Sequence, residues 1–93
     1  MPPVHRQTDL TCGHGCYPPE VPTSWSPNVR VNGLGVVRYG DSRKQHCCND
    51  SCHGATYIGT ARVRVNGRYA QHVGHPLDDG DSVCNGSPNV NFG

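Results

Sequence analysis

Hydrophobic and polar residues alternate in two short segments that are almost identical. Residues 29–33 read Val-Arg-Val-Asn-Gly, and residues 63–67, 34 positions later, repeat the same five letters. Alternation places both valines on one face of a strand. Asn-Gly favours a tight hairpin turn, because both residues readily adopt positive φ. Each segment therefore predicts the first strand and the turn of a β-hairpin, with return strands at 34–39 and 68–73.

The return strands repeat as well, and the two ends of the sequence complete the pattern. Residues 36–41 resemble residues 70–75, and residues 4–9 are a third version. Residues 87–93 begin with Ser-Pro-Asn-Val, as residues 26–29 do. One hairpin is therefore split between the ends of the sequence. We expect an all-β fold of three hairpins with pseudo-threefold symmetry; the alternative is an ordinary small sandwich with coincidental hairpins.

Composition supports a small β-protein that needs a cross-link. The 93 residues suffice for one domain, which we place at residues 1–93. They include 12 Gly and 8 Pro, and these two residues are the worst formers of a helix interior. Only 33% of the residues are hydrophobic, so the core is thin and a disulfide, a metal or a partner subunit should stabilise it.

The charge balance and the first residues narrow the partners and the compartment. A formal net charge of +1 argues against a nucleic-acid binder and against an electrostatic membrane binder. No apolar run approaches the ~18 residues of a membrane span, and residues 1–6 lack the pattern of a signal peptide. We therefore expect folding in a reducing cytosol, where Cys and His serve first as metal ligands and only second in disulfides.

The loops between the repeats, at 10–25, 42–59 and 76–86, hold nearly all of the Cys and His. His14 and His46 each lie five residues after the Asp that ends a return strand. The third loop offers Cys84, its only thiol, and His53 lies further along the second loop. Three pseudo-equivalent ligands and one more predict a tetrahedral site, and zinc favours closed four-coordinate sites of His and Cys. The metal would join distant segments, so metal binding and folding should be coupled.

Other arrangements of the same residues remain open. Two Cys-x3-Cys pairs provide the four thiols of a rival zinc site, at Cys12, Cys16, Cys48 and Cys52. Disulfides without a metal are a second alternative, and disulfides involving Cys12, Cys16, Cys47 or Cys52 are compatible with the metal site. We expect the remaining histidines to be strand-surface or hydrogen-bonding residues; these are His5, His72 and His75.

Several motifs together resemble the PAAR-repeat proteins, and the resemblance covers essentially the whole chain. They are Ser-Pro-Asn-Val-x-Val-Asn-Gly at 26–33, Arg-x-Gly-Asp at 38–41, Gly-His-Gly at 13–15, His-Cys-Cys at 46–48, Cys-His-Gly at 52–54 and the closing Gly-Ser-Pro-Asn-Val at 86–90. The resemblance implies a small cone with Gly/Pro-rich loops and a metal, zinc or alternatively iron, at its apex. The ligands that it implies are His14, His46, His53 and Cys84.

The sequence also departs from the family pattern. The Pro-Ala-Ala-Arg that names the family is degraded at residues 2–6 and 35–38. Thr8 stands in place of a family Gly, and His75 in place of the Asp. These changes lie in the return strands rather than in the loops that hold the expected ligands.

The resemblance also implies a function and a partner. We expect a structural, membrane-piercing tip that caps a trimeric β-helical spike, either VgrG-like in a type VI secretion system or the central spike of a contractile phage tail. One cap would bind each trimer and contact the target membrane transiently. We expect no catalysis, because four protein ligands leave zinc no open position for water. The alternatives are a stand-alone zinc-stabilised binding module and a small zinc hydrolase.

Overall fold

The computed structural model describes residues 1–92, and within them it contains six strands and no helix. The strands form three antiparallel sheets of two strands each, so the expected all-β class is confirmed. Their bounds are β1 Arg30–Val31, β2 Leu34–Gly35, β3 Ser42–Cys48, β4 Ser51–Thr56, β5 Arg64–Val65 and β6 Arg68–Tyr69. None of the described residues belongs to a helix that could cross a membrane.

Both hairpins with an Asn-Gly turn form, but the return strands β2 and β6 are shorter than the predicted 34–39 and 68–73. β1 pairs with β2 around Asn32 and Gly33, whose φ angles are 55° and 80°. β5 pairs with β6 around Asn66 and Gly67, with φ angles of 55° and 77°. Positive φ at both central residues gives the turn a twist that matches the flanking strands, which is why this dipeptide favours short hairpins.

The two ends of the described chain pair with each other, as the split hairpin requires. The Val4 N–H donates to the Val90 carbonyl at 3.0 Å, and a bridge joins Pro3 to Asn91. The equivalent bond recurs in the other two hairpins, at 3.1 Å from Val36 to Val29 and at 2.9 Å from Ala70 to Val63. Val4, Val36 and Ala70 hold the same position in their return strands, so the sequence repeat corresponds to a repeat in backbone pairing.

The return strands also bond to one another in a closed ring. His5 N–H donates to the Gln71 carbonyl at 2.9 Å, Gln71 N–H to the Val37 carbonyl at 2.9 Å, and Val37 N–H to the His5 carbonyl at 3.1 Å. These three residues occupy equivalent positions of the repeat. Each return strand therefore contacts both of the others.

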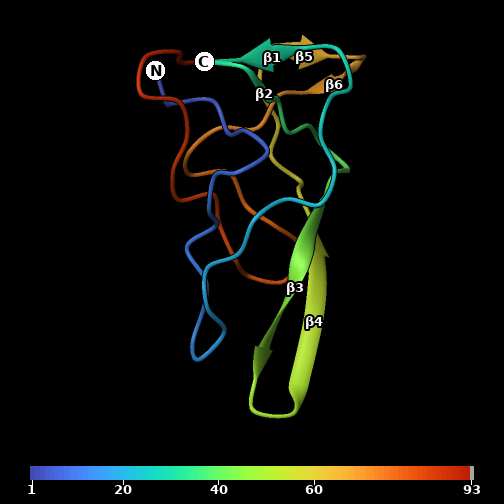
Figure 1. Ribbon diagram of the computed structural model, residues 1–93, viewed down its shortest axis with the longest axis vertical. Helices are drawn as coiled ribbons and strands as arrows, with labels where there is room; N and C mark the ends of the chain where they lie inside the picture. The colour runs from blue at the N-terminus through green and yellow to red at the C-terminus, as the bar shows by residue number, and fades with distance from the viewer. Residues whose placement is uncertain (93) are drawn as a thin grey trace.

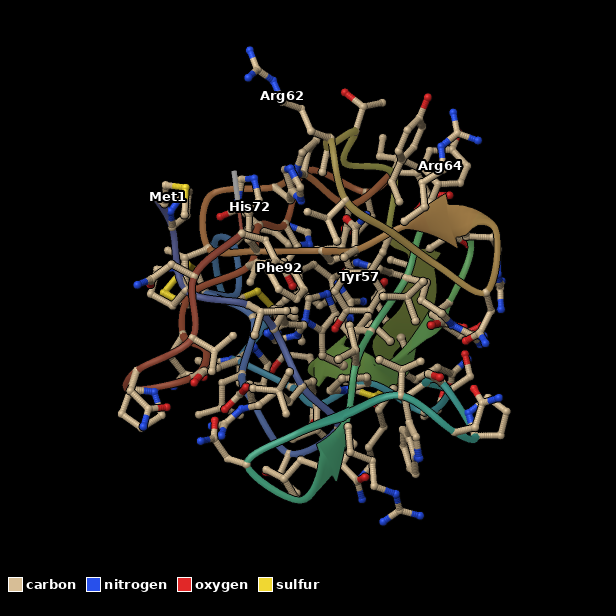
Figure 2. All side chains as sticks on the ribbon, turned by 90° about the horizontal axis from the view of Figure 1, so that it is seen from above. Met1, Tyr57, Arg62, Arg64, His72 and Phe92 are labelled. Atoms are coloured by element: carbon tan, nitrogen blue, oxygen red, sulfur yellow. A yellow bond between two sulfur atoms is a disulfide. The ribbon has the colours of Figure 1, made fainter. Side chains whose placement is uncertain are left out.

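Two hairpins and both termini lie at one end of the 36 Å long axis, and the β3–β4 hairpin extends to the other (Figure 1). We call the first the terminal end, made of β1–β2, β5–β6 and the paired chain ends. We call the second the distal end, made of β3–β4 and the segments 10–25 and 76–84. In the view onto the terminal end, Arg62 and Arg64 point outward and Tyr57 lies inside (Figure 2).

The core consists of two small clusters of buried hydrophobic residues. The first lies under the terminal-end hairpins and contains Val4, Val31, Val36, Val65 and Ala70. The second contains Val37, Tyr57, Leu77 and Val83. Most of these side chains are valines, and Val31 and Val65 come from the two Val-x-Val-Asn-Gly repeats.

The β3–β4 hairpin is the main difference from the expected fold, because residues 42–59 were predicted to be a loop. Its buried side chains in β3 are Arg43 and His46, which are polar. Hydrophobic alternation therefore could not indicate this strand. The turn between β3 and β4 contains Asn49, which has a φ of 56°, and Asn tolerates this conformation better than most residues.

Candidate metal centre

Three imidazoles and one carboxylate converge in the distal end. The residues are His14, His46, His53 and Asp79, and their ligand atoms all lie within 4.8 Å of one another. The Nε2 atoms of His14 and His46 are 3.1 Å apart, those of His14 and His53 3.2 Å, and those of His46 and His53 2.8 Å. Asp79 Oδ2 lies 3.3 Å from Nε2 of His14, 3.4 Å from that of His46 and 2.8 Å from that of His53.

These four atoms have the arrangement that a tetrahedral metal requires. A tetrahedron with edges of 2.8 to 3.4 Å places its vertices about 1.9 Å from its centre. Zinc binds His nitrogen and carboxylate oxygen at about 2.0–2.2 Å. Imidazole also suits iron and other transition metals. The donor set thus fits a single transition-metal ion with four protein ligands.

Local structure explains how the ligands meet. His46 of β3 and His53 of β4 are direct partners in the register of the hairpin, so pairing alone brings them together. His14 lies in a tight turn that bridges to Tyr17. Gly13 in this turn has a φ of 79°, and a Cβ there would lie 2.5 Å from the Tyr17 carbonyl oxygen. Glycine is therefore required beside His14 for both conformation and space.

A hydrogen bond from Nδ1 fixes the tautomer of His46. Nδ1 lies 2.9 Å from the Pro18 carbonyl, which can only accept, so Nδ1 carries the hydrogen. Nε2 then presents a lone pair to the cluster. Such a hydrogen bond from the far nitrogen is a regular feature of metal-binding histidines.

Asp79 is held in its charged form. Burial acts to raise the pKa of Asp79, but hydrogen bonds from Arg43 and from the Asp81 backbone outweigh it, so the pKa lies below its ordinary value. Arg43 Nη1 lies 2.8 Å from Asp79 Oδ2, the same oxygen that faces the three imidazoles. A carboxylate that stays ionised is a competent metal ligand.

The Tyr17 ring lies against the cluster. Its centroid is 5.1 Å from that of His14, 4.9 Å from that of His46 and 4.3 Å from that of His53. The Tyr17 hydroxyl donates to Ser51 Oγ at 2.9 Å and so ties the ring to the start of β4. His46 is fully buried as a side chain, whereas the side chains of His14 and His53 are 28% and 32% exposed. The site is thus shielded on one side and within reach of solvent on another.

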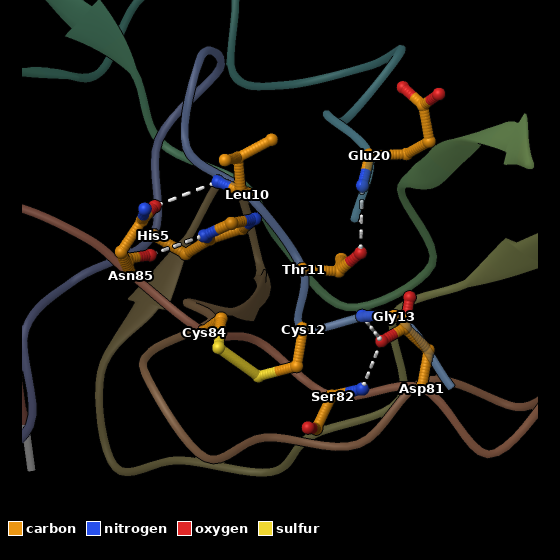
Figure 3. The surroundings of a disulfide bond; sticks show 10 residues. All are labelled: His5, Leu10, Thr11, Cys12, Gly13, Glu20, Asp81, Ser82, Cys84 and Asn85. Carbon is orange, nitrogen blue, oxygen red and sulfur yellow. Dashed lines mark hydrogen bonds between the residues drawn. A yellow bond between two sulfur atoms is a disulfide. The ribbon is translucent and has the colours of Figure 1, made fainter. Parts of the chain in front are cut away.

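The structure brings together the three predicted histidines but not Cys84. Cys84 forms a disulfide with Cys12, which joins the first loop to the third (Figure 3). Asp79 takes the fourth position in its place. The other cysteines pair as Cys16–Cys48 and Cys47–Cys52. The disulfides therefore use all four thiols of the rival zinc site, and the alternative that disulfides coexist with a metal cluster describes the structure best.

The sequence pattern does not point to Asp79, because in the third loop a ligand set of His and Cys leads to Cys84. The position five residues after His75, equivalent to His14 and His46, is Gly80. Asp79 lies one residue before it, and carboxylates also bind zinc. This near-match in spacing was the signal in the sequence. The sequence alone does not show that Arg43 contacts Asp79, because this contact exists only in the folded chain.

The remaining histidines lie outside the cluster and form hydrogen bonds. His5 is fully buried rather than on a strand surface: Nδ1 donates to the Asn85 carbonyl at 2.8 Å, and Nε2 accepts from the Tyr57 hydroxyl at 3.0 Å. Burial lowers the pKa of His5, so the ring is neutral. His75 accepts the His72 N–H through Nδ1 at 3.0 Å. In the other two repeats this bond is accepted by Asp9 and Asp41.

Comparisons with known proteins add no family to this description. The sequence matches no protein-family model and no curated protein.

Proposed function

We propose that this protein is a metal-stabilised tip that caps a trimeric β-helical spike and pierces a membrane. The observation that carries the proposal is the closed ring of backbone bonds among His5, Val37 and Gln71. The ring joins equivalent positions of three return strands, and it supports an approximate threefold axis within one chain. A trimer presents three equivalent surfaces around such an axis, so a single chain with three similar hairpins can contact all three in the same way.

The terminal end is the surface that would bind the spike. β1–β2, β5–β6 and the paired chain ends lie there together (Figure 1). Their strands are only two residues long in each hairpin, and an open strand edge can extend the sheet of a partner through main-chain hydrogen bonds. The distal end would then point away from the spike, toward the target membrane. The resemblance to PAAR-repeat proteins supports the same orientation.

The ion would stabilise the structure of the distal end. His14, His46, His53 and Asp79 would hold zinc, with iron as the alternative, and join the first, second and third loops at one centre. Four protein ligands close the tetrahedron, which is typical of structural rather than catalytic zinc. The ion would resist local opening in a region with little hydrophobic burial. The assembled cap would be part of a phage tail or of a secretion spike.

The test is stoichiometric assembly with a defined partner. The chain is produced together with a trimeric β-helical spike protein from the same genome, and the complex is weighed by native mass spectrometry and imaged by electron microscopy. One chain per three spike chains, seated on the blunt tip, is the expected result. Failure to bind such spikes while the chain remains folded and metal-loaded would contradict the proposal. Hydrolytic activity that chelation removes would instead favour a small zinc hydrolase.

A further inference from the structure

Arg43 is a fully buried cation beside the cluster, and all three of its guanidinium nitrogens donate hydrogen bonds. Its side chain is 0% exposed. Nη1 donates to Asp79 and to Asp81, each at 2.8 Å. Nη2 donates to the carbonyl of His53 at 3.2 Å, and Nε to that of Lys44 at 3.1 Å. One guanidinium therefore contacts two of the four ligand residues directly.

The contacts of Arg43 extend to a third ligand through Asp81. The Asp81 carboxylate accepts the Gly13 N–H at 2.8 Å and the Ser82 N–H at 2.7 Å (Figure 3). Gly13 immediately precedes His14, so this bond fixes the turn that carries the ligand. Arg43 itself lies in β3 with His46. Every ligand is thus connected to Arg43 by the same strand or by one or two hydrogen bonds.

We propose that Arg43 is the positioning residue of the metal centre, and that it holds Asp79 as the fourth ligand. Asp79 and Asp81 both accept from Nη1, so two carboxylates share one buried cation. Without that cation the two negative charges would repel each other at close range. Asp79 would then turn toward solvent and leave three histidines. The proposal depends on metal binding but not on the spike-tip role.

A matched pair of variants tests this role. Arg38 is also buried, and it bonds Asp41 through Nε and Nη2, but it lies outside the metal centre. Co²⁺ serves as the probe, because its visible absorption reports the ligands and geometry. Arg43→Met should weaken Co²⁺ binding by about 10–100-fold, the usual effect of losing an outer partner of a ligand. Arg38→Met should leave the affinity and the spectrum of the folded fraction unchanged.

Two further variants separate positioning from a general loss of stability. Asp79→Asn removes the proposed ligand charge, and the Co²⁺ spectrum of Arg43→Met should resemble that of Asp79→Asn. Arg43→Lys keeps a positive charge and one nitrogen that can donate to both carboxylates, so it should restore part of the Co²⁺ affinity. If Arg43→Met does not fold, Asp81→Asn decides, since it removes one anchor of Arg43 and should also weaken Co²⁺ binding. Wild-type affinity and spectrum in Arg43→Met, or in Asp81→Asn where Arg43→Met does not fold, would overturn the proposal.

A separate observation concerns the cysteines, which lie beside the ligands in the sequence. Cys47 follows His46 and Cys52 precedes His53, and these cysteines are partners in the next position of the hairpin register. Cys12 and Cys16 lie two residues before and after His14. Their disulfides connect the first loop to the third and to the second. The segments joined by the disulfides are those joined by the cluster.

We infer that metal binding selects this pairing of the cysteines. Six cysteines allow 15 pairings. An ion bound by the three loops would hold each thiol near its partner and lower the entropy cost of closing these pairs. A disulfide oxidant such as oxidised glutathione then completes the bond. Each pair of thiols gives up two electrons and two protons, one S–S bond forms, and the S–S bond of the oxidant breaks to give two molecules of reduced glutathione.

Refolding with disulfide mapping tests the inference. The reduced, unfolded chain is refolded in a glutathione redox buffer with Zn²⁺ or with a chelator, and the pairs are identified by mass spectrometry. Zn²⁺ should raise the fraction with all three pairs at least several-fold. His53→Ala keeps every thiol but breaks the cluster, so Zn²⁺ should have no such effect, whereas His72→Ala should behave as the wild type. Equal fractions with and without Zn²⁺ in the wild type would overturn the inference.

Discussion

The two ends of the molecule are stabilised in different ways. At the terminal end, three hairpins bond through their backbones, and a cluster of valines lies beneath them. Two buried ion pairs, Arg6–Asp9 and Arg38–Asp41, complete this region. At the distal end, the buried residues of β3 are Arg43 and His46, and the cross-links are three disulfides and the candidate metal centre.

The comparison shows how a short chain divides its stabilising interactions. Hydrophobic burial needs a face covered by other elements, and the repeats provide this only where their hairpins meet. A projecting hairpin has too few neighbours to bury a hydrophobic face. Cross-links act differently, since they restrict the unfolded chain and need little buried area. The region proposed to meet a membrane is therefore the one that depends least on a hydrophobic core.

Removing every cross-link should have the largest effect and should affect the distal end first. Each native disulfide of a small domain contributes about 2–5 kcal/mol, so reduction together with chelation should lower the free energy of unfolding by more than about 4 kcal/mol. Hydrogen exchange is the measurement: amides of Ser42–Thr56 should lose protection before those of Val4 and Ala70. Simultaneous loss at both ends would mean that the two regions do not differ in this way.

His46→Ala should have the next largest effect and should separate the metal from the disulfides. A metal at 1,000 times its dissociation constant stabilises a fold by about 4 kcal/mol. The variant should lose metal content and melting temperature together, with its disulfides intact. The controls are metal analysis and calorimetry of the wild type with and without chelator. Unchanged metal content in the variant would remove His46 from the site.

Val36→Ala should have a smaller effect: it should lower stability without lowering metal affinity. Val36 is 0% exposed within the terminal-end cluster, so truncation leaves a cavity that costs about 2 kcal/mol. Urea unfolding measures the loss. The affinity for Co²⁺ should stay that of the wild type, because the cluster of valines does not touch the metal centre. A large fall in metal affinity would show that the two ends are tightly coupled.

The smallest effect concerns pH and the one repeat that lacks an Arg–Asp pair. Burial, and then the neighbouring His72, lower the pKa of His75 from 6.5 to about 4. The unfolded chain therefore takes up the proton first, and stability present above about pH 6.5 is lost as pH falls toward 4. Because solvent screens part of this interaction, the loss at pH 5 should be on the order of 1 kcal/mol.

His75→Asp provides the matched comparison for this titration. It restores the residue that accepts the same bond in the other two repeats, through Asp9 and Asp41. Urea unfolding from pH 7 to pH 4.5 should show a shallower decline in stability for the variant than for the wild type. An identical decline in both proteins would assign the pH dependence to other groups, such as His5.

The repeated residues determined much of the fold because their information is local. Val-x-Val-Asn-Gly specifies a strand and its turn within five residues, and the split copy placed the chain ends side by side. The spacing of His14 and His46 after the return strands predicted both as ligands, and both lie in the cluster. His53 lies in the cluster too, because it pairs with His46 in the hairpin.

Tertiary structure alone decided the remainder of the candidate site. A polar strand such as Ser42–Cys48 has no hydrophobic period, so it becomes visible only once its partner is in place. The choice of Asp79 over Cys84 depends on Arg43, which is distant in sequence, and on the competing disulfide to Cys12. The pairing of six thiols depends on which loops lie together. Each of these outcomes is set by contacts between distant segments, and the order of residues along the chain does not specify such contacts by itself.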